Sequence, residues 1–497
     1  MIKHRSSIII VALYFISYGL ILMNNGLYWD DWDLINYTKN ELFTVFSSMG
    51  NVETYYLHNY LLFGLHSLYI YKVIVFVSFL TTTLIFNEIL SKMNEINDYS
   101  RFFIVALFSQ FPISSTRIAI ITTPGTIKNL LFYVGAYLFV MCIKKRSLLL
   151  RVLALLSFYL SFTLNSTLTL YLVVLPILLL YFGRESGAAL KYDRIRYADF
   201  ISAPFIFLVI KKIYLSPYGT NVGYNHFDLA SMLNAVKMLI VPFYTTLIEV
   251  LLVSLNNFSG IYVISALILA ALIGRNEKAW EYNIFYKRMF ACGILLFAAS
   301  IFPYLSVDKL PTFSDWNGRF QILTPLGASI IIYCLLRLLM EKAKIEKGFQ
   351  HLVLCLILVS FVGMNVKSYY LYKRDWYKQL SIMENLRSDE NVINIKEVAF
   401  VDRTTALNVN SRTYRLYEYQ GVLNRVFGKG VKHAVRPSET DRGKGSVHNN
   451  GDVLTIAIDY GDYDLNISHM VRLMLRELFT TEYFIINIKR AVHFAVI

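Results

Sequence analysis

Long apolar runs alternate with short polar segments from Ser7 to about residue 366. Each run has about 17 to 25 residues, the length that an α-helix needs to cross a hydrocarbon layer of ~30 Å. The pattern predicts a polytopic α-helical membrane protein with about eleven transmembrane helices. The expected spans are 7–23, 68–90, 102–120, 129–143, 148–164, 167–183, 199–215, 258–274, 289–305, 320–340 and 349–366.

One further apolar stretch, 229–255, is interrupted by Pro242 and Glu249 and has no basic flank after it. A full crossing here would move the basic loop 275–288 to the outer side, against the rule that Lys and Arg collect on the inner side. We therefore expect a re-entrant or interfacial segment in place of a twelfth span.

The pattern changes after residue 366. Residues 367–497 are polar, contain no run of membrane-spanning length, and include the strand-like stretch 452–458 beside turn-rich clusters such as 448–452. A segment of about 130 residues is long enough to fold on its own. The sequence predicts a transmembrane domain over 1–366, with an acidic first outer loop at 24–58, and a C-terminal exterior α/β domain over 367–497.

Composition supports the membrane class. The 497 residues are 56% hydrophobic and only 16% charged, whereas soluble proteins carry about 25% charged residues. The net charge of +14 does not indicate nucleic-acid binding, because most Lys and Arg lie between apolar runs as topology determinants do. The four cysteines, Cys142, Cys292, Cys334 and Cys355, lie inside apolar runs without metal-ligand spacing.

The distribution of positive charge also predicts sidedness. Lys3 and Arg5 precede the first span, and basic clusters such as 144–146 and 342–347 fall on the same side as the N-terminus in the eleven-span arrangement. An odd number of crossings then places the C-terminal domain outside. We expect a multi-pass protein of a bacterial inner (plasma) membrane, with a cytoplasmic N-terminus and a periplasmic or exterior C-terminal domain.

A dense acidic cluster follows the first span. Asp30, Asp31 and Asp33 alternate with Tyr28, Trp29 and Trp32. Aromatic residues are expected at a membrane interface, but clustered carboxylates there cost desolvation unless the charge has a use. One carboxylate can act as a general base whose pKa its neighbours raise, or two, such as Asp30 and Asp31, can hold a divalent cation such as Mg²⁺ or Mn²⁺. The tryptophans suit stacking on a sugar or resting on lipid. The alternative is an ordinary interfacial loop.

Several positively charged residues are expected on the same outer face. Arg319 lies at the predicted start of a helix, where a cation is unfavourable unless it meets an anion such as a lipid phosphate. The alternative is an arginine that reaches bulk lipid headgroups. Other candidate substrate-binding residues are Arg117, Lys128, Lys212 and His58, although an ordinary interfacial histidine is an alternative for His58.

The order of these features resembles the GT-C superfamily of membrane glycosyltransferases. The resemblance rests on the first helix followed at once by Asp30, Asp31 and Asp33, on many further helices, on the late segment from Arg319 to Pro325, and on a C-terminal exterior domain. The layout is also similar to that of serotype-converting O-antigen glucosyltransferases.

This resemblance implies inverting transfer of a sugar, glucose among the candidates, from a polyprenyl-phosphate donor to a glycan acceptor such as O-antigen of lipopolysaccharide. The base would be Asp30, Asp31 or Asp33, and Arg319 would lie near the lipid phosphate. A requirement for a divalent metal stays open. Two alternatives remain: a polysaccharide polymerase, and a flippase or transporter of a lipid-linked sugar. The polymerase is disfavoured by short later outer loops, and the transporter by few ionisable residues within the spans.

Overall fold

A computed structural model describes residues 2–185, 197–223, 229–256, 259–274, 284–312, 316–437, 453–479 and 481–496. The chain divides into two compact units. The helical unit comprises Met1–Gly19, Phe43–Arg117 and Thr122–Val366, and the sheet unit comprises Leu20–Leu42, Ile118–Ile121 and Lys367–Ile497. The second unit therefore includes part of the first loop that the sequence assigned to the membrane domain.

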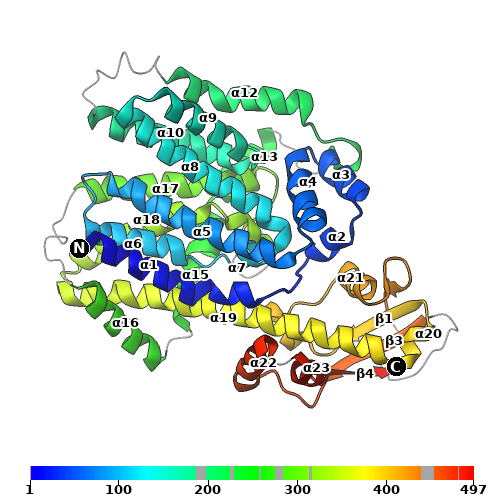
Figure 1. The fold of residues 1–497 in the computed structure, drawn as a ribbon. Helices are drawn as coiled ribbons and strands as arrows, with labels where there is room; N and C mark the ends of the chain where they lie inside the picture. Colours follow the sequence, from blue (N-terminus) through cyan, green and yellow to red (C-terminus); the bar gives the residue numbers. More distant parts are fainter. Residues whose placement is uncertain are drawn as a thin grey trace. The chain divides into compact units, whose positions relative to one another are not determined.

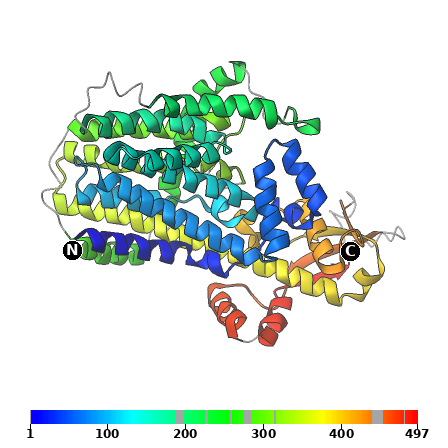
Figure 2. The ribbon, with the colours of Figure 1, turned by 45° about the horizontal axis from the view of Figure 1, so that its top comes forward.

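Helices make up the helical unit. Among the long helices, α8 packs against α5 and α9, and α17 packs against α18; Figures 1 and 2 show them running side by side. The helices are α1 (Ile2–Tyr18), α4 (Val52–Asn59), α5 (Leu68–Ser91), α6 (Asp98–Gln110), α7 (Ser114–Ile118), α8 (Thr123–Lys145), α9 (Leu148–Ser161), α10 (Ser166–Glu185), α12 (Ala198–Tyr214), α13 (Leu229–Met238), α14 (Ile240–Pro242), α15 (Glu249–Asn256), α16 (Gly260–Ile273), α17 (Ile284–Leu305), α18 (Thr324–Lys342) and the first part of α19 (Lys347–Ser388). Helix α3 (Lys39–Ser48) begins in the sheet unit and ends in this one.

Within the described residues, 8 helices are long and apolar enough to cross a membrane. Their presence identifies a polytopic helical membrane protein, because only helices satisfy every backbone polar group within one segment in a bilayer. The eight are Arg5–Met23, Leu68–Ser91, Ile120–Lys145, Ser166–Gly183, Ala230–Asn256, Tyr286–Leu305, Thr324–Lys342 and Lys347–Ser388. Two shorter apolar helices, Leu148–Ser161 and Gly260–Ile273, coincide with two further predicted spans.

The structure corrects the predicted span 102–120. Helix α6 ends at Gln110, and Phe111 and Pro112 follow it in non-helical conformation. Proline disfavours the helical conformation for the residue before it, which explains the end of the helix at this point. The next long apolar helix then begins at Ile120, earlier than the predicted start at 129.

The stretch 229–255 also differs from the prediction. Its helices form one continuous apolar segment, Ala230–Asn256, which is 27 residues long and so has the length to cross a membrane. Pro242 is tolerated because it lies in the first turn after a turn at Leu239, where the backbone N–H that proline lacks has no intrahelical partner to lose. The chain then continues as the π-helix Phe243–Ile248, in which the Thr246 hydroxyl donates to the Pro242 carbonyl at 2.6 Å.

Helix α19 extends beyond its predicted end at 366. It runs for 42 residues, from Lys347 to Ser388, and its residues from Lys367 onward belong to the sheet unit. The apolar part ends near 366 as the sequence indicates. No proline lies within the helix, so the helix continues after the residues become polar.

The sheet unit contains a four-stranded sheet in the order β2-β1-β3-β4. Strand β1 (Glu397–Asp402) pairs in parallel with β2 (His433–Val435) and with β3 (Val453–Tyr460), and β3 pairs antiparallel with β4 (Val492–Val496). The helices of this unit are α2 (Asp31–Asn36), the second part of α19, α20 (Glu390–Asn394), α21 (Leu416–Phe427), α22 (Ile467–Phe479) and α23 (Thr481–Lys489).

Helix α21 connects the parallel strands β1 and β2 (Figure 1). It packs on β1 through the stacked rings of Tyr419 and Phe400, whose centroids are 4.7 Å apart. Helix α2 packs against α21 in turn. This arrangement brings the acidic cluster of the first loop beside a strand–helix–strand element formed by residues about 370 positions later.

Candidate functional site

Asp31 is completely buried, and its carboxylate binds backbone. It accepts hydrogen bonds from the backbone N–H of Tyr28 at 3.1 Å, of Ile120 at 3.1 Å and of Ile121 at 2.9 Å. Both carboxylate oxygens are therefore occupied by amides that would otherwise be buried without acceptors. Asp31 holds the first loop to residues 120–121 and is the least suited of the three aspartates to take a proton from a substrate.

Trp29 and Trp32 lie in the core of the sheet unit. Trp29 is 5% exposed, and the Arg412 guanidinium carbon lies 5.1 Å from the centroid of its ring. Trp32 is 1% exposed and lies so close to α21 that a Cβ at Gly421 would come within 2.8 Å of its ring. The prediction that these rings stack on a sugar or rest on lipid is wrong, because neither ring has a face available.

Asp30 and Asp33 flank Asp31 and are only half-buried. The Tyr417 hydroxyl donates to Asp30 Oδ1 at 3.0 Å. Burial raises the pKa of Asp33, and the charges of Asp30 and Glu418 raise it further. A carboxyl group surrounded by other acids favours its protonated form. Asp33 is therefore the aspartate whose pKa moves toward that of a general base.

An open pocket of about 690 Å³ lies next to this acidic cluster, within the sheet unit. Asp402 and Val435, the last residues of β1 and β2, line it together with Arg415, Tyr417 and Arg436. The carboxyl ends of adjacent parallel strands are a recurrent ligand-binding position in α/β folds. Tyr417 belongs to both features, since it lines the pocket and donates to Asp30.

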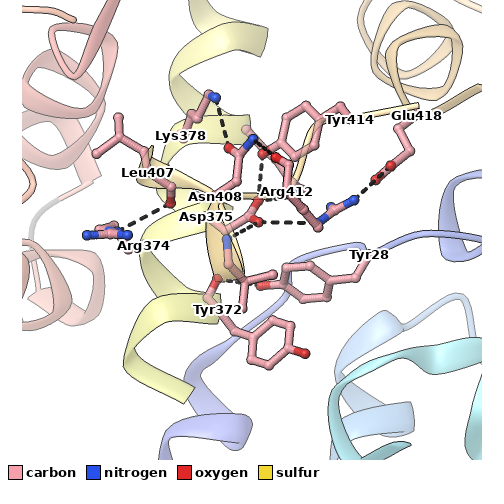
Figure 3. Close-up of polar contacts among 12 residues, drawn as sticks. Tyr28, Tyr372, Arg374, Asp375, Lys378, Leu407, Asn408, Arg412, Tyr414 and Glu418 are labelled. Carbon is pink, nitrogen blue, oxygen red and sulfur yellow. Dashed lines mark hydrogen bonds and ion pairs between the residues drawn. The ribbon is translucent and has the colours of Figure 1, made fainter. Parts of the chain in front are cut away.

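Buried charges hold the chain segment that leads into the pocket (Figure 3). Asp375 of α19 accepts hydrogen bonds from the Tyr414 hydroxyl at 2.5 Å and from the Val409 backbone N–H at 2.9 Å. Arg412 Nε lies 3.8 Å from Asp375, and its Nη1 donates to Glu418 at 2.8 Å. Because Glu418 lies in the first turn of α21, this chain of contacts connects α19 to the start of that helix.

A second buried ion pair fixes the end of β1. Lys378 Nζ donates to Asp402 at 2.6 Å, to Asn408 Oδ1 at 2.8 Å and to the Thr404 carbonyl at 3.1 Å. The lysine side chain is 0% exposed and that of Asp402 is 2% exposed. A buried pair is tolerated only when further hydrogen bonds satisfy both partners, as they do here. The pocket wall at Asp402 is therefore rigidly held.

Sequence reasoning missed these supporting residues. Asp375, Lys378 and Gln379 lie one helical turn apart, so their spacing indicates a shared polar helix face. Their partners lie about 25 to 40 residues further along the chain, Asp402 at the end of β1 and Asn408 and Arg412 in the connection that follows it. No motif marked those partners in advance.

In the helical unit, Arg319 lies in the 3₁₀ segment Trp316–Gln321, so it precedes α18 and does not open it as predicted. Its guanidinium carbon is 4.3 Å from the ring centroid of Trp316 and 4.9 Å from that of Phe320. Lys309, which the sequence did not single out, lies 5.8 Å from the Phe320 ring. Burial and the charge of Arg319 lower the pKa of Lys309 to about 8. Two cations held together in this way favour an anion between them.

Two other predicted site residues, His58 and Lys128, contact residues within the helical unit. His58 is completely buried, with Nδ1 2.9 Å from the Tyr71 hydroxyl, and burial and Lys128 lower its pKa to about 3. Lys128 Nζ forms an ion pair with Glu53 at 2.8 Å. The prediction that His58 binds substrate is corrected to a neutral core histidine, and Lys128 has its charge matched by Glu53.

Arg117 is buried, 2% exposed, in an aromatic cage. Its guanidinium carbon lies 4.0 Å from the Tyr18 ring centroid and 4.2 Å from that of Phe79, and Nη2 donates to the Ser109 carbonyl at 3.2 Å. Because the aromatic rings bury Arg117, the prediction that it binds a phosphate lipid is wrong. Lys212 is exposed near the end of α12, and its predicted role stays a prediction.

Within the described part of the chain, no group of three or more His, Cys, Asp or Glu side chains is arranged to hold a metal ion. Of the two aspartates named as candidate ligands, Asp31 already binds three backbone amides through its carboxylate oxygens. Asp30 accepts from Tyr417. The arrangement thus brings together Asp30, Asp33 and a pocket, and leaves Asp31 a structural role.

The contrast between Asp31 and Asp33 predicts opposite effects on stability. We expect Asp31→Ala to reduce the free energy of unfolding by about 3 kcal/mol or more, because it leaves buried backbone amides without an acceptor. The measurement is chemical denaturation of the detergent-solubilised protein, followed by tryptophan fluorescence, which reports on Trp29 and Trp32.

Asp33→Ala is the matched control on the same helix. Its raised pKa means that folding disfavours the charged carboxylate, so removal of the group should leave the free energy of unfolding at pH 7 equal to or higher than that of the wild type. Equal losses in the two variants would contradict the structural role assigned to Asp31.

Comparison with other proteins assigns no family and no function to this chain. No family model, no curated protein and no solved structure matches the chain. The resemblance of the acidic first loop and the Arg319 segment to GT-C glycosyltransferases therefore stays a prediction drawn from the sequence. The case for a function comes from Asp30, Asp33 and the pocket beside Tyr417 in the sheet unit and, separately, from Lys309 and Arg319 in the helical unit.

Proposed function

We propose that this chain is a membrane glycosyltransferase that moves a sugar from a polyprenyl-phosphate donor to a hydroxyl of a cell-surface glycan at the outer membrane face. The observation that carries the proposal is the position of Asp33, a half-buried carboxyl group beside Asp30 and Glu418; burial and the charges of these two acids raise its pKa. A general base works best when its pKa approaches the working pH.

Of the three aspartates that the resemblance to GT-C enzymes implicates, Asp33 is the base that the contacts favour. Asp31 is occupied by backbone amides, and Asp30 accepts from Tyr417. Among the described residues, Asp33 has no hydrogen-bonding or ion-pairing partner that would satisfy its carboxylate. Asp30 then acts as the neighbour whose charge makes Asp33 more basic.

The pocket beside Tyr417 is the proposed acceptor site. It lies within the sheet unit, and the ring of the half-buried Tyr417 in its wall suits the apolar face of a sugar ring. The exposed Arg415 and Arg436 add positive charge. Arginine binds carboxylate and phosphate in a bidentate manner, so an acidic glycan would fit best.

Within the helical unit, Lys309 and Arg319 are proposed to bind the phosphate of the donor lipid. Burial and, after it, the charge of Arg319 lower the pKa of Lys309. A phosphate that lies against the two cations relieves their mutual repulsion.

The reaction balances without an added oxidant or reductant. The Asp33 carboxylate takes the proton of the acceptor hydroxyl while the hydroxyl oxygen forms a bond to the anomeric carbon. The bond from that carbon to the phosphate oxygen breaks, and its electron pair leaves with polyprenyl phosphate. Attack opposite the leaving group inverts the anomeric configuration.

Variants of the two half-buried aspartates should separate base from neighbour. Asp33→Asn should lower kcat by about 10²- to 10⁴-fold, because general-base catalysis contributes that much. Asp30→Asn should keep measurable transfer but move the acidic limb of the pH–rate profile to lower pH, since the charge that raises the pKa of Asp33 is gone. The assay is transfer of labelled sugar from a polyprenyl-phosphate donor in proteoliposomes.

The opposite pattern, loss of transfer in Asp30→Asn and full activity in Asp33→Asn, would assign the base to Asp30. Full activity of the Asp30→Asn/Asp33→Asn double variant would overturn a catalytic role for this loop.

The cation pair predicts how donor binding depends on pH. Lys309 is protonated below its pKa of about 8 and loses its charge above it, so the KM for donor should rise between pH 7 and 9. Lys309→Gln should raise KM at pH 7 and abolish this dependence. Arg319→Gln should also raise KM but shift the dependence to higher pH, because its charge lowers the Lys309 pKa.

Lys237→Gln is the control for these two variants, since it removes an exposed cation of the same unit that has no assigned role. Its KM should match that of the wild type. If all three variants raised KM equally, general attraction to an anionic membrane would explain the effect and the assigned phosphate site would be wrong.

A further inference from the structure

A basic pocket of about 660 Å³ lies in the helical unit, where three long helices begin or end. Its lining comes from the first turn of α17, the last turns of α18, the connection after α18 and the first turn of α19. These helices are all membrane-spanning candidates, so the pocket lies at the depth of the lipid headgroups.

Four lysines line the pocket, namely Lys287, Lys342, Lys344 and Lys347. Glu341 is the acidic residue in its lining, and it pairs with the buried Arg337 at 3.1 Å. Because Arg337 neutralises Glu341, the lysines give the pocket a strongly positive potential.

Three of the lysines lie on or beside a well-defined turn that connects α18 to α19. Lys344 has a positive φ of 51°, and its backbone N–H donates to the Glu341 carbonyl at 3.0 Å. Gln350 of α19 closes the turn by donating to the Ile345 carbonyl at 2.7 Å. The positions of Lys342, Lys344 and Lys347 are thus fixed by the backbone and do not depend on a loose loop.

Lys347 is the first residue of α19, and Glu346 directly precedes it. The Glu346 carbonyl accepts from the backbone N–H of Gln350 at 3.0 Å, which fixes the start of the helix. An anion in the pocket is attracted by the lysine side chains that line it.

We propose that this pocket binds the phosphate of an anionic phospholipid headgroup. Leu338 and Ile345 contribute apolar surface to the lining, which suits the glycerol and upper acyl region of a lipid better than a fully hydrated ion. Basic pockets between membrane helices bind such headgroups. This site lies in the helical unit, is independent of the proposed transfer reaction, and serves to anchor a structural or regulatory lipid.

The test compares lipid binding by two charge-matched variants of the full-length protein in detergent. Native mass spectrometry with added phosphatidylglycerol should show that Lys342→Gln/Lys344→Gln/Lys347→Gln weakens binding on the order of 100-fold. Removal of one lysine near an anionic lipid surface weakens binding about fivefold, and the three effects multiply. Phosphatidylcholine is the zwitterionic comparison lipid and should bind weakly to the wild type and to both variants.

The control is Lys144→Gln/Lys145→Gln/Arg146→Gln. It removes three exposed cations that line none of the pockets described above, and Arg146 has a φ of 53°, which matches that of Lys344. The control should bind phosphatidylglycerol like the wild type. Both triple variants should melt like the wild type without added lipid, because all six side chains are exposed.

Equal loss of phosphatidylglycerol binding in the two triple variants would show general attraction to anionic lipid and overturn the proposal. Inorganic phosphate supplies the second arm. If it displaced phosphatidylglycerol at millimolar concentration and bound alone with the same dependence on the lysines, the site would take free phosphate and the lipid assignment would be wrong. Loss confined to the pocket variant, with no effect of phosphate, supports the lipid.

Discussion

The buried carboxylate of Asp31 fixes the first loop, and the positions of the neighbouring acids follow from it. It accepts three backbone N–H groups from residues 28, 120 and 121, which lie far apart in sequence. Asp30 and Asp33, one position before it and two positions after it, lie on a different face of the helical turn from Asp31 and are half-buried. A structural carboxylate therefore positions two others, and burial together with the charge of Asp30 raises the pKa of Asp33.

Much of the helical unit could be predicted from apolar run length alone. The runs at 68–90, 167–183 and 289–305 coincide with α5, α10 and α17, because a helix in lipid must satisfy its own backbone. The failures have local causes. Pro112 ends α6 where hydrophobicity continues, while Pro242 is tolerated because it lies in the first turn after a turn at Leu239. Helix α19 passes from apolar to polar residues without a break.

The site was predictable only in part. The density of acids at 30–33 marked the correct segment, but composition does not distinguish Asp31, held by amides, from Asp33, which lies among other acids. Trp29 and Trp32 were misread because an aromatic residue beside a span resembles an interfacial anchor, whereas here α21 and Arg412 cover both rings. Those partners lie almost 400 residues away in sequence, and no pattern along the chain connects them.

The central claim is that the chain transfers a sugar and that Asp33 carries out the proton transfer. The most direct measurement is the composition and linkage of the surface glycan in cells that lack the gene and are complemented with the wild type or with Asp33→Asn. The account predicts one additional sugar, at unchanged glycan chain length, with the wild type and none with Asp33→Asn. A change in chain length, or loss of all exported glycan without the gene, would contradict it and indicate a polymerase or a flippase.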